Sequence, residues 1–376
     1  MITTQIESGT QRTSLPVARG RTRALPDTKV LLAGKLTALD APGGGEIQMA
    51  AMAESLPELG IDARLWRPWE DAIEDVDCLH LFGSEREHLP LVEAARRRGV
   101  PVALSTIAWF ELANCLREPR PVVRRLAAGA RFVARAVCPR LPSWRRKLYQ
   151  SVDLLMPNSN AEAQQLMHYF GVPAERIHVT PNGADTRFAD ADPRPFRELM
   201  GTDEFVLYAG RIEPRKNQLG FLCAMRDSDV PIVMLGDVVP GYQWYFEQCR
   251  RMAGDNVRFI PRIEHDDPML ASAYAACGCL VLASSFETPG LVALEAGMSG
   301  SSLVLPKGGC AVEYFGQQAM YVKPDDFQGI RRAVESALAR GRSRRLANHV
   351  QTYFSWKAAA EITVSGYNKL SRRTTV

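Results

Sequence analysis

The chain has 376 residues, and its 46 Lys and Arg against 42 Asp and Glu give a formal net charge of only +4. A hydrophobic content of 46% is that of a globular protein and excludes a chain that is disordered throughout. Domains of about 150 residues are the norm, so this length predicts two domains or one large one. Eight cysteines without a Cys-x-x-Cys pair favour buried thiols in a reducing compartment over a disulfide framework.

The first 27 residues are polar and Arg-bearing, and they lack the continuous apolar core of a secretory signal peptide. We therefore expect residues 1–27 to be a disordered leader and the protein to be cytoplasmic. The longest uncharged segment, residues 268–286, is interrupted by serines, a glycine and two cysteines. It predicts a short helix followed by a strand rather than a membrane span.

Short β-rich segments then alternate with helix-length segments along the whole chain. The first set of predicted strands covers residues 29–34, 62–66, 76–82, 102–105, 153–157 and 177–180. After a polar, proline-bearing stretch, a second set covers residues 205–210, 231–235, 257–260, 279–283, 302–306 and 319–322. Strands separated by helices predict parallel sheets that are covered on both faces.

This alternation predicts an α/β fold with two doubly wound parallel-sheet domains, residues 28–190 and 191–352, joined near residues 183–200. Residues 353–376 are predicted to contain one last helix. Ligands of open parallel sheets bind beyond the carboxyl ends of the strands. Two such sheets facing each other therefore predict a binding site in the cleft between them.

Three consecutive glycines, Gly43, Gly44 and Gly45, follow the first predicted strand and precede a predicted helix. Without Cβ atoms their amides are open to a ligand, and the positive end of the helix favours a phosphate. The segment matches neither a Gly-x-Gly-x-x-Gly fingerprint nor a P-loop. A turn that binds nothing is therefore an equal alternative.

Two cations follow the first strand of the second set. Arg211 comes directly after this strand, and Lys216 follows as the next helix begins. Two cations on a loop above a cleft suit a diphosphate, whereas a solvated basic turn is the alternative of equal weight.

The most informative segment follows the fourth strand of the second set. Glu287 precedes a Thr-Pro-Gly turn into a helix predicted over residues 291–298, and Glu295 lies about one turn inside that helix. The amides of Gly290 and Leu291 can face an anion, and a carboxylate is the usual partner of ribose hydroxyls. One capping and one solvated glutamate would be the alternative, but it leaves the position of Gly290 unexplained.

The segments GRIEPRKNQ and ETPGLVALE, the second with seven residues between its two glutamates, resemble the retaining GT-B glycosyltransferases of family 4. Further matching segments follow in order from about residue 28: Gly43–Glu46, Asn158–Ser159, Pro181–Asp185, Gly308–Gly309 with Glu313, and Phe354, Ser355, Trp356 and Tyr367. The resemblance implies the GT-B fold, in which two facing Rossmann-like, doubly wound parallel-sheet domains enclose a cleft. The terminal helix would cross back onto the first domain.

The resemblance also implies the activity, a hexosyltransferase of class EC 2.4 that acts with retention. The donor would be a nucleotide-diphosphate sugar, UDP- or GDP-linked, and the acceptor a polysaccharide or lipid-linked glycan. By this resemblance Arg211 and Lys216 would bind the diphosphate, and the amides of Gly290 and Leu291 would help to bind its phosphates. Glu287 would bind the donor sugar, and Glu295 the ribose hydroxyls. The loop with Gly44 and Gly45 would close over the donor from the other domain, and the nucleotide base would lie near Ile263. Because no metal-ligand spacing occurs, we expect no metal and no further cofactor.

The sequence departs from the family pattern at one position. Many members carry a His shortly after the fourth strand, where this chain has about Ile107. Retention in this family is usually explained by front-face attack, which gives the cations and helix dipoles the main role. We therefore expect activity to survive, with Trp109 or Glu111 sharing the orienting role. His80, at the end of a predicted strand, is a candidate for the lining of the cleft.

Two other functions remain open. A GT-B sugar-nucleotide epimerase is disfavoured by the paired glutamates. A non-catalytic nucleotide-sugar-binding protein of a glycan assembly complex is supported only by the missing His.

The small net charge conceals an uneven distribution. Residues 117–150 hold ten Arg and Lys and one Glu, a net +9, so the other 36 basic and 41 acidic residues sum to −5. A helix here would gather Val122, Leu126, Val133 and Val137 within about 60° of each other on one face, with Arg124, Arg131 and Arg135 on the opposite side. The candidates for contact with an anionic inner membrane face are Arg124, Arg125, Arg131 and Arg135. The alternative of equal weight is a helix that packs its apolar face on the protein's own core. Binding of nucleic acid by this segment is disfavoured because aromatic residues are sparse in it.

Overall fold

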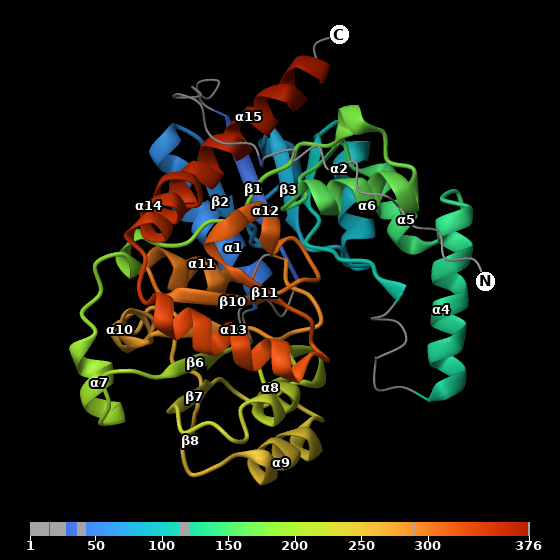
Figure 1. Ribbon diagram of the computed structural model, residues 1–376. Helices are drawn as coiled ribbons and strands as arrows, with labels where there is room; N and C mark the ends of the chain where they lie inside the picture. Colours follow the sequence, from blue (N-terminus) through green and yellow to red (C-terminus); the bar gives the residue numbers. More distant parts are fainter. Residues whose placement is uncertain (1–14, 16–27, 36–42, 113–120, 289, 375–376) are drawn as a thin grey trace.

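The structure, a computed structural model, describes residues 15, 28–35, 43–112, 121–288 and 290–374. Apart from Leu15, the predicted leader lies outside the described residues. The described chain forms two α/β domains, one above the other in Figure 1. Among the described helices, none combines the length and the apolar composition needed to cross a bilayer.

The N-terminal domain is built on a five-stranded parallel sheet in the order β2-β1-β3-β4-β5. Its strands are β1 (Lys29–Ala33), β2 (Asp62–Leu65), β3 (Cys78–Phe82), β4 (Val102–Ser105) and β5 (Leu154–Leu155). Its helices are α1 (Gly44–Ser55), α2 (His88–Arg97), α4 (Val122–Val137), α5 (Trp144–Ser151) and α6 (Asn160–Phe170), with 3-10 turns at Pro57–Leu59, Ile73–Asp75 and Ala174–Arg176. The strand predicted over 177–180 is reduced to one bridge between Leu155 and Ile177.

The C-terminal domain is built on a six-stranded parallel sheet in the order β11-β10-β9-β6-β7-β8. Its strands are β6 (Val206–Ala209), β7 (Ile232–Leu235), β8 (Val257–Ile260), β9 (Cys279–Val281), β10 (Ser302–Pro306) and β11 (Met320–Val322). Its helices are α7 (Arg194–Met200), α8 (Gln218–Ala224), α9 (Gln243–Met252), α10 (Pro268–Ala276), α11 (Leu291–Met298), α12 (Ala311–Phe315), α13 (Phe327–Arg340) and α14 (Arg344–Tyr353), with 3-10 turns at Thr186–Phe188, Pro214–Lys216 and Gly316–Gln318.

The order of strands reverses at one point in each sheet. In the C-terminal sheet the reversal lies between β6 and β9, and in the N-terminal sheet it lies between β1 and β3. Helices on opposite faces leave a crevice at such a point, which is where doubly wound sheets bind their ligands. The central strands are apolar and buried on both faces, as covered parallel sheets require.

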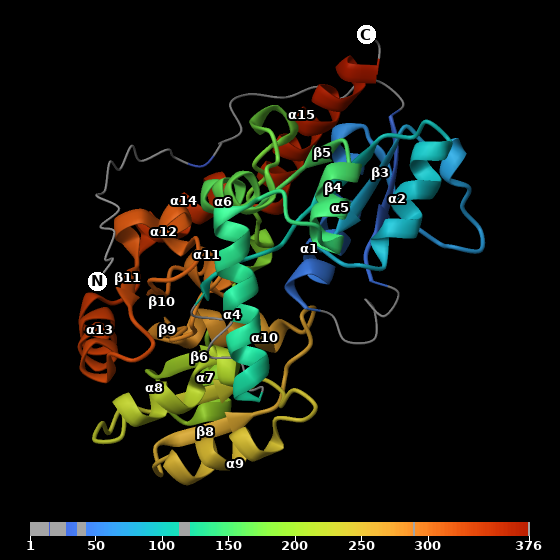
Figure 2. The same ribbon diagram turned by 90° about the vertical axis from the view of Figure 1, so that its right-hand side faces the viewer.

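The last helix, α15 (Trp356–Thr374), follows the C-terminal domain but packs on the N-terminal one (Figures 1 and 2). The hydroxyl of Tyr367 lies 2.7 Å from Nδ1 of His80 in β3, and the other ring nitrogen of His80 lies 3.0 Å from Oγ of Ser105. Burial lowers the pKa of His80 to about 3. The expectation that His80 lines the cleft is therefore wrong, because this side chain lies in the core beneath α15.

A second junction between the domains lies at the start of α6. The carboxylate of Glu313, in α12, accepts hydrogen bonds from the backbone N–H groups of Asn160 and Ala161, both at 2.8 Å. A carboxylate is favourable at this positive helix end. The hydroxyl of Tyr314 donates to the carbonyl of Asn158 at 2.6 Å and accepts from the N–H of Asn182 at 3.0 Å. Several segments that resemble the family thus form the domain junction.

Candidate functional site

A buried ion pair lies at the reversal point of the C-terminal sheet. Lys216 ends the 3-10 turn that follows β6, and Glu287 lies in the loop that follows β9. Nζ of Lys216 is 2.6 Å from Oε1 of Glu287, and only 11% and 5% of the two side chains are exposed. Oγ of Ser284 donates to the same carboxylate oxygen at 2.6 Å. The structure therefore brings together two of the three predicted catalytic residues.

The surroundings of Glu287 keep it ionised. Burial by itself raises the pKa of this carboxyl, but the charges of Lys216 and Arg215 and the hydrogen bonds from Lys216 and Ser284 together lower it below its ordinary value of 4.5. Taking two charges out of water is costly, so a buried pair is weak evidence for stabilisation. Charged groups whose pKa values are shifted by such neighbours are typical of functional sites.

Two glycines leave room for Glu287. Gly290 precedes α11 with φ of +85°, and a Cβ there would lie 3.2 Å from Oε2 of Glu287. Gly309 has φ of +95°, and its Cβ would lie only 2.0 Å from the carbonyl oxygen of Glu287. The N–H of Cys310 donates to that oxygen at 3.0 Å. Any side chain at Gly309 would therefore displace the backbone of Glu287, while Pro289 of the predicted turn lies outside the described residues.

Arg211, the third predicted catalytic residue, lies apart from this pair. Its side chain is 62% exposed, and its guanidinium is 3.6 Å from the carboxylate of Glu213. Arg215 lies closer to the site, because its guanidinium is 5.3 Å from the centre of the Phe286 ring and its charge lowers the pKa of Glu287. Sequence reasoning missed Arg215, although its place directly before Lys216 was the available signal.

Glu295 has a partner that the sequence did not suggest. It is buried in the second turn of α11, and its Oε1 lies 3.0 Å from Nε2 of His265. The guanidinium of Arg187 lies 3.0 Å from Nδ1 of His265. Because Arg can only donate, Nδ1 accepts and Nε2 carries the proton that His265 donates to Glu295. Ile263 is half-buried two residues before His265.

The two domains approach each other at the glycine loop. A Cβ on Gly44 would lie 3.8 Å from Cδ1 of Leu291, so the start of α1 touches the start of α11. The rings of Trp109 and Phe286 stack with their centres 6.3 Å apart. Helix α1 begins at Gly44, two residues earlier than predicted.

A cavity of about 390 Å³ lies beside this contact. Its walls are the loops after β1, β3 and β4, together with one cation of α5 and one of the C-terminal domain: Lys35, Gly43–Glu46, Phe82–Glu85, Ile107–Phe110, Arg145 and Arg211. The cavity therefore opens at the reversal point of the N-terminal sheet, facing the second domain. It includes Gly44 and Gly45 of the predicted donor site.

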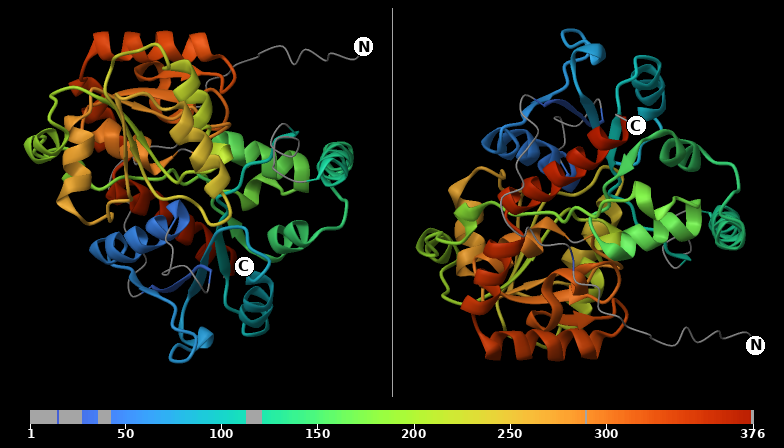
Figure 3. Two further views of the ribbon diagram at one scale, coloured as in Figure 1. Left: turned by 90° about the horizontal axis from the view of Figure 1, so that it is seen from below. Right: turned by 90° about the horizontal axis from the view of Figure 1, so that it is seen from above.

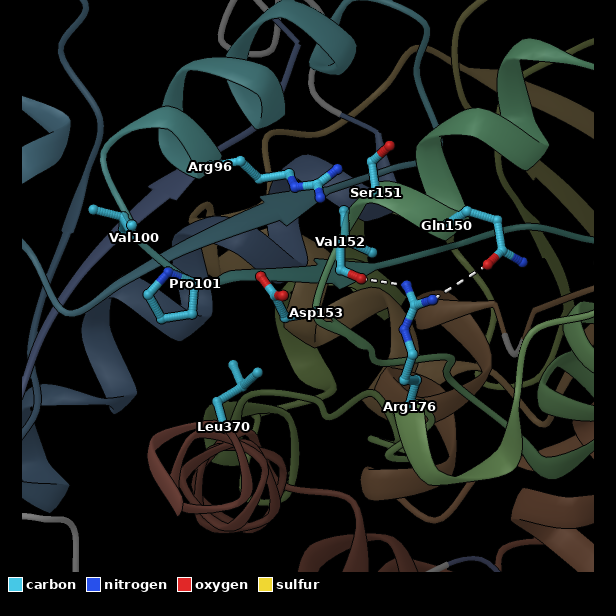
Figure 4. A pocket seen from close by; sticks show the side chains of 10 residues that line it. Arg96, Val100, Pro101, Gln150, Ser151, Val152, Asp153, Arg176 and Leu370 are labelled. Atoms are coloured by element: carbon cyan, nitrogen blue, oxygen red, sulfur yellow. Dashed lines mark hydrogen bonds between the residues drawn. The ribbon is translucent and has the colours of Figure 1, made fainter. Parts of the chain in front are cut away.

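A larger cavity, of about 490 Å³, lies at the opposite ends of β4 and β5 (Figure 4). Its polar groups already serve the fold. Asp153 accepts from the N–H of Val102 at 2.8 Å, and the guanidinium of Arg176 donates to the carbonyls of Tyr149 and Val152. Because parallel sheets bind ligands at the carboxyl ends of their strands, we do not take this cavity as the functional site.

The loop after β4 is held in an unusual conformation. Ile107 has φ of +45°, which is a rare and strained value for a β-branched residue. On either side of it, the carboxylate of Glu162 accepts from Oγ1 of Thr106 and, at 2.7 Å, from the N–H of Ala108. Its other oxygen accepts from the N–H of Asn158 at 2.8 Å. Glu162 therefore fixes the backbone at the position where many family members carry His.

Within the described parts of the chain, no group of three or more His, Cys, Asp or Glu side chains is arranged to hold a metal ion.

Two family models match consecutive parts of the chain: Glycosyltransferase Family 4 over residues 74–188 and Glycosyl transferases group 1 over residues 192–351. The chain belongs to the GT-B glycosyltransferases of family 4. The predicted membership of family 4 is thereby confirmed, and the two parallel-sheet α/β domains confirm the predicted GT-B fold class.

Relatives and solved structures agree with this membership. A D-inositol 3-phosphate glycosyltransferase of Paenarthrobacter aurescens is 29% identical over 299 residues, which are 74% of this chain and 69% of that protein. Sucrose-phosphate synthase from Thermosynechococcus elongatus has the same fold with a TM-score of 0.72 at 17% identity, covering 92% of this chain and 100% of that one. Anabaena HepE in complex with UDP has the same fold with a TM-score of 0.62 at 19% identity, covering 93% of this chain and 99% of that one.

Gly309→Ala tests the support of Glu287 by its neighbouring backbone. Because the added Cβ would lie 2.0 Å from a carbonyl oxygen, we expect a loss of about 2–4 kcal/mol in unfolding free energy, measured by denaturant titration. Gly201→Ala is the matched control: φ there is +66° with nothing within 4 Å of a Cβ, so the cost should be about 1 kcal/mol. Equal losses in both variants would contradict the packing described here.

Glu162→Gln tests the anchor of the Ile107 loop through its pH dependence. Burial raises the pKa of Glu162 from 4.5 to about 7, so the folded state holds this proton more tightly than the unfolded chain does. The associated stability is fully present below pH 4.5 and is lost as the pH rises through about 7. The Tm of wild type minus that of the variant should therefore fall across this range. The exposed control Glu335→Gln should show no such slope.

Proposed function

We propose that the protein transfers a hexose-type sugar from a nucleotide-diphosphate sugar to a glycan or lipid-linked glycan, with retention of the anomeric configuration. The observation that carries the proposal is the buried Lys216–Glu287 pair beside the start of α11, at the strand-order reversal of the second sheet. Support also comes from the fold neighbour HepE, which is in complex with UDP, and from the relative named for an inositol phosphate substrate.

In this proposal the donor diphosphate lies at the start of α11. The N–H groups of Gly290 and Leu291 and the positive helix end face the phosphates, with Lys216 and Arg211 as the cations. Arg211 is exposed, and among the described residues its ion-pair partner is Glu213 at 3.6 Å, so its guanidinium is available for this role. Glu295 binds the ribose hydroxyls, oriented by the hydrogen bond from His265. The nucleotide base rests near Ile263, and UDP or GDP is the proposed carrier.

Glu287 binds hydroxyl groups of the donor sugar. Lys216 and Ser284 fix the carboxylate in one orientation, which is what positioning of a sugar requires. In the transfer step the acceptor oxygen attacks the anomeric carbon on the face from which the nucleoside diphosphate leaves. The bond from carbon to the diphosphate oxygen breaks, the bond to the acceptor oxygen forms, and the acceptor proton passes to the leaving phosphate. The cations stabilise the negative charge that develops there.

The acceptor enters from the cavity of the N-terminal domain. Trp109 lines this cavity, and its indole Nε1 is buried without a hydrogen-bond partner among the described residues. A buried donor without a partner is costly, so a substrate oxygen is its proposed acceptor. Trp109 would then supply part of the orientation that other family members draw from a His. Neither a metal nor a further cofactor is part of the proposal.

Glu287→Gln and Lys216→Met test the activity. Each removes a charge that faces the transferring group, so we expect turnover of nucleotide sugar to fall about 10²–10³-fold or more. Lys147→Met, which breaks an exposed pair with Glu93 at 2.8 Å, is the matched control and should keep full activity. Conversion of the donor without an acceptor would indicate an epimerase instead. Binding of nucleotide sugar by wild type without any turnover would indicate a non-catalytic protein.

Trp109→Phe tests the proposed substrate hydrogen bond. The ring can still stack on Phe286, but the N–H is lost, so we expect kcat/KM for the acceptor to fall about tenfold. Donor affinity should stay the same. Trp69→Phe, at a side chain that is 98% exposed, is the control. An unchanged acceptor kcat/KM in Trp109→Phe would contradict this role.

A further inference from the structure

Helix α4 exposes its apolar face to solvent. Five of its large apolar side chains are half or more exposed: Val122 at 65%, Val123 at 78%, Leu126 at 61%, Val133 at 50% and Val137 at 81%. Of the whole helix only Gly129 is buried. An amphipathic helix of a globular protein normally turns this face to the core. The alternative that α4 packs its apolar face on the protein's own core is therefore wrong.

The opposite side of α4 is the one attached to the protein. The ring of Phe132 lies 5.0 Å from that of Tyr169 in α6, and the guanidinium of Arg135 lies 4.9 Å from the centre of the Phe170 ring. Arg135 also donates to Oγ of Ser143 at 3.0 Å. Figures 1 and 3 show α4 at the outer edge of the molecule, apart from both sheets. Of the four predicted membrane-facing arginines, Arg135 thus turns inward.

The charge around the exposed face has one sign. Residues 121–150 contain eight Arg and Lys and no Asp or Glu. Arg124 and Arg131 are exposed on the polar side of α4, away from its apolar face, and within the described residues no carboxylate pairs with either of them. Lys147 is paired with Glu93, but it lies on α5. The surface that covers α4 must therefore be both apolar and negatively charged.

This requirement selects among the possible occupants. A second copy of α4 would bring equal positive charge to the contact. The leader, residues 1–27, carries four arginines against one Glu and one Asp, so it too is positive. An anionic bilayer offers apolar acyl chains beneath a layer of phosphates. A helix of 16 residues is about 24 Å long, which suits a position in the plane of that interface.

We propose that α4 docks this glycosyltransferase onto an anionic lipid bilayer, with Val122, Leu126, Val133 and Val137 inserted and Arg124 and Arg131 at the lipid phosphates. The docking itself does not rest on the proposed function. Its consequence does, because a lipid-linked acceptor would then reach the cavity beside α5, the helix that follows α4. Arg145 of α5 lines that cavity.

Sedimentation with vesicles tests the proposal. The full chain should sediment with vesicles of phosphatidylglycerol and phosphatidylcholine, and not with phosphatidylcholine alone. Combining Val122→Ser, Leu126→Ser, Val133→Ser and Val137→Ser should weaken binding about tenfold or more, since the apolar face is lost. The matched control combines Leu199→Ser and Phe327→Ser, two apolar residues that are 54% and 46% exposed elsewhere, and should bind as wild type.

Arg124→Glu with Arg131→Glu should also abolish sedimentation, and added salt should weaken the wild type. Arg135 is left unchanged because its substitution would loosen α4. Circular dichroism and Tm confirm that each variant folds. The proposal would be overturned if the serine variant sediments like wild type, or if wild type does not sediment with anionic vesicles. It would also be overturned if wild type is a dimer in solution and the serine substitutions make it monomeric. Nucleotide-sugar binding, measured in parallel, should be unchanged, and its absence in wild type would refute the proposed function alone.

Discussion

The buried ion pair between Lys216 and Glu287 is the constraint around which the second domain is arranged. Two charges removed from water demand close partners, and the chain supplies them from loops that follow two neighbouring strands. Gly309 is required at its position because the carbonyl of Glu287 occupies the space of a Cβ, and a Cβ on Gly290 would crowd the carboxylate of Glu287 at 3.2 Å. The pair thus explains two glycines and a serine as parts of one arrangement.

The domains are held together by polar contacts between segments that are distant in the sequence. Glu313 caps α6 of the other domain, and Tyr367 reaches His80 in the first sheet. These contacts set the position of the glycine loop against Leu291, so the cleft is a product of the junction. The strained Ile107, held through Glu162, lies on the same wall. Strain of this kind persists only where the surroundings enforce it, which is typical of functional loops.

Local sequence patterns predicted most helices and strands and the two-domain order, because hydrophobic periodicity and turn residues are properties of short segments. The helix predicted over 291–298 is α11 with the same bounds. Side-chain contacts between residues far apart in the sequence could not be predicted from these local patterns. Glu162 reaches a loop 54 residues away, His80 is buried by a tyrosine 287 residues away, and His265 meets Glu295 only through the fold. Whether the apolar face of α4 packs on the core or faces solvent could not be predicted either, because the sequence shows which residues share a face but not what that face contacts.

The measurement that tests the central claim most directly is a thermal-shift series with UDP, GDP, dTDP and ADP sugars on wild type and Lys216→Met. A ligand present at about 100 times its Kd stabilises the folded state by about 2.7 kcal/mol, which raises Tm observably. The account predicts a clear rise for one nucleotide class in wild type and a much smaller rise in the variant. No rise with any of the four, or equal rises in both proteins, would contradict it.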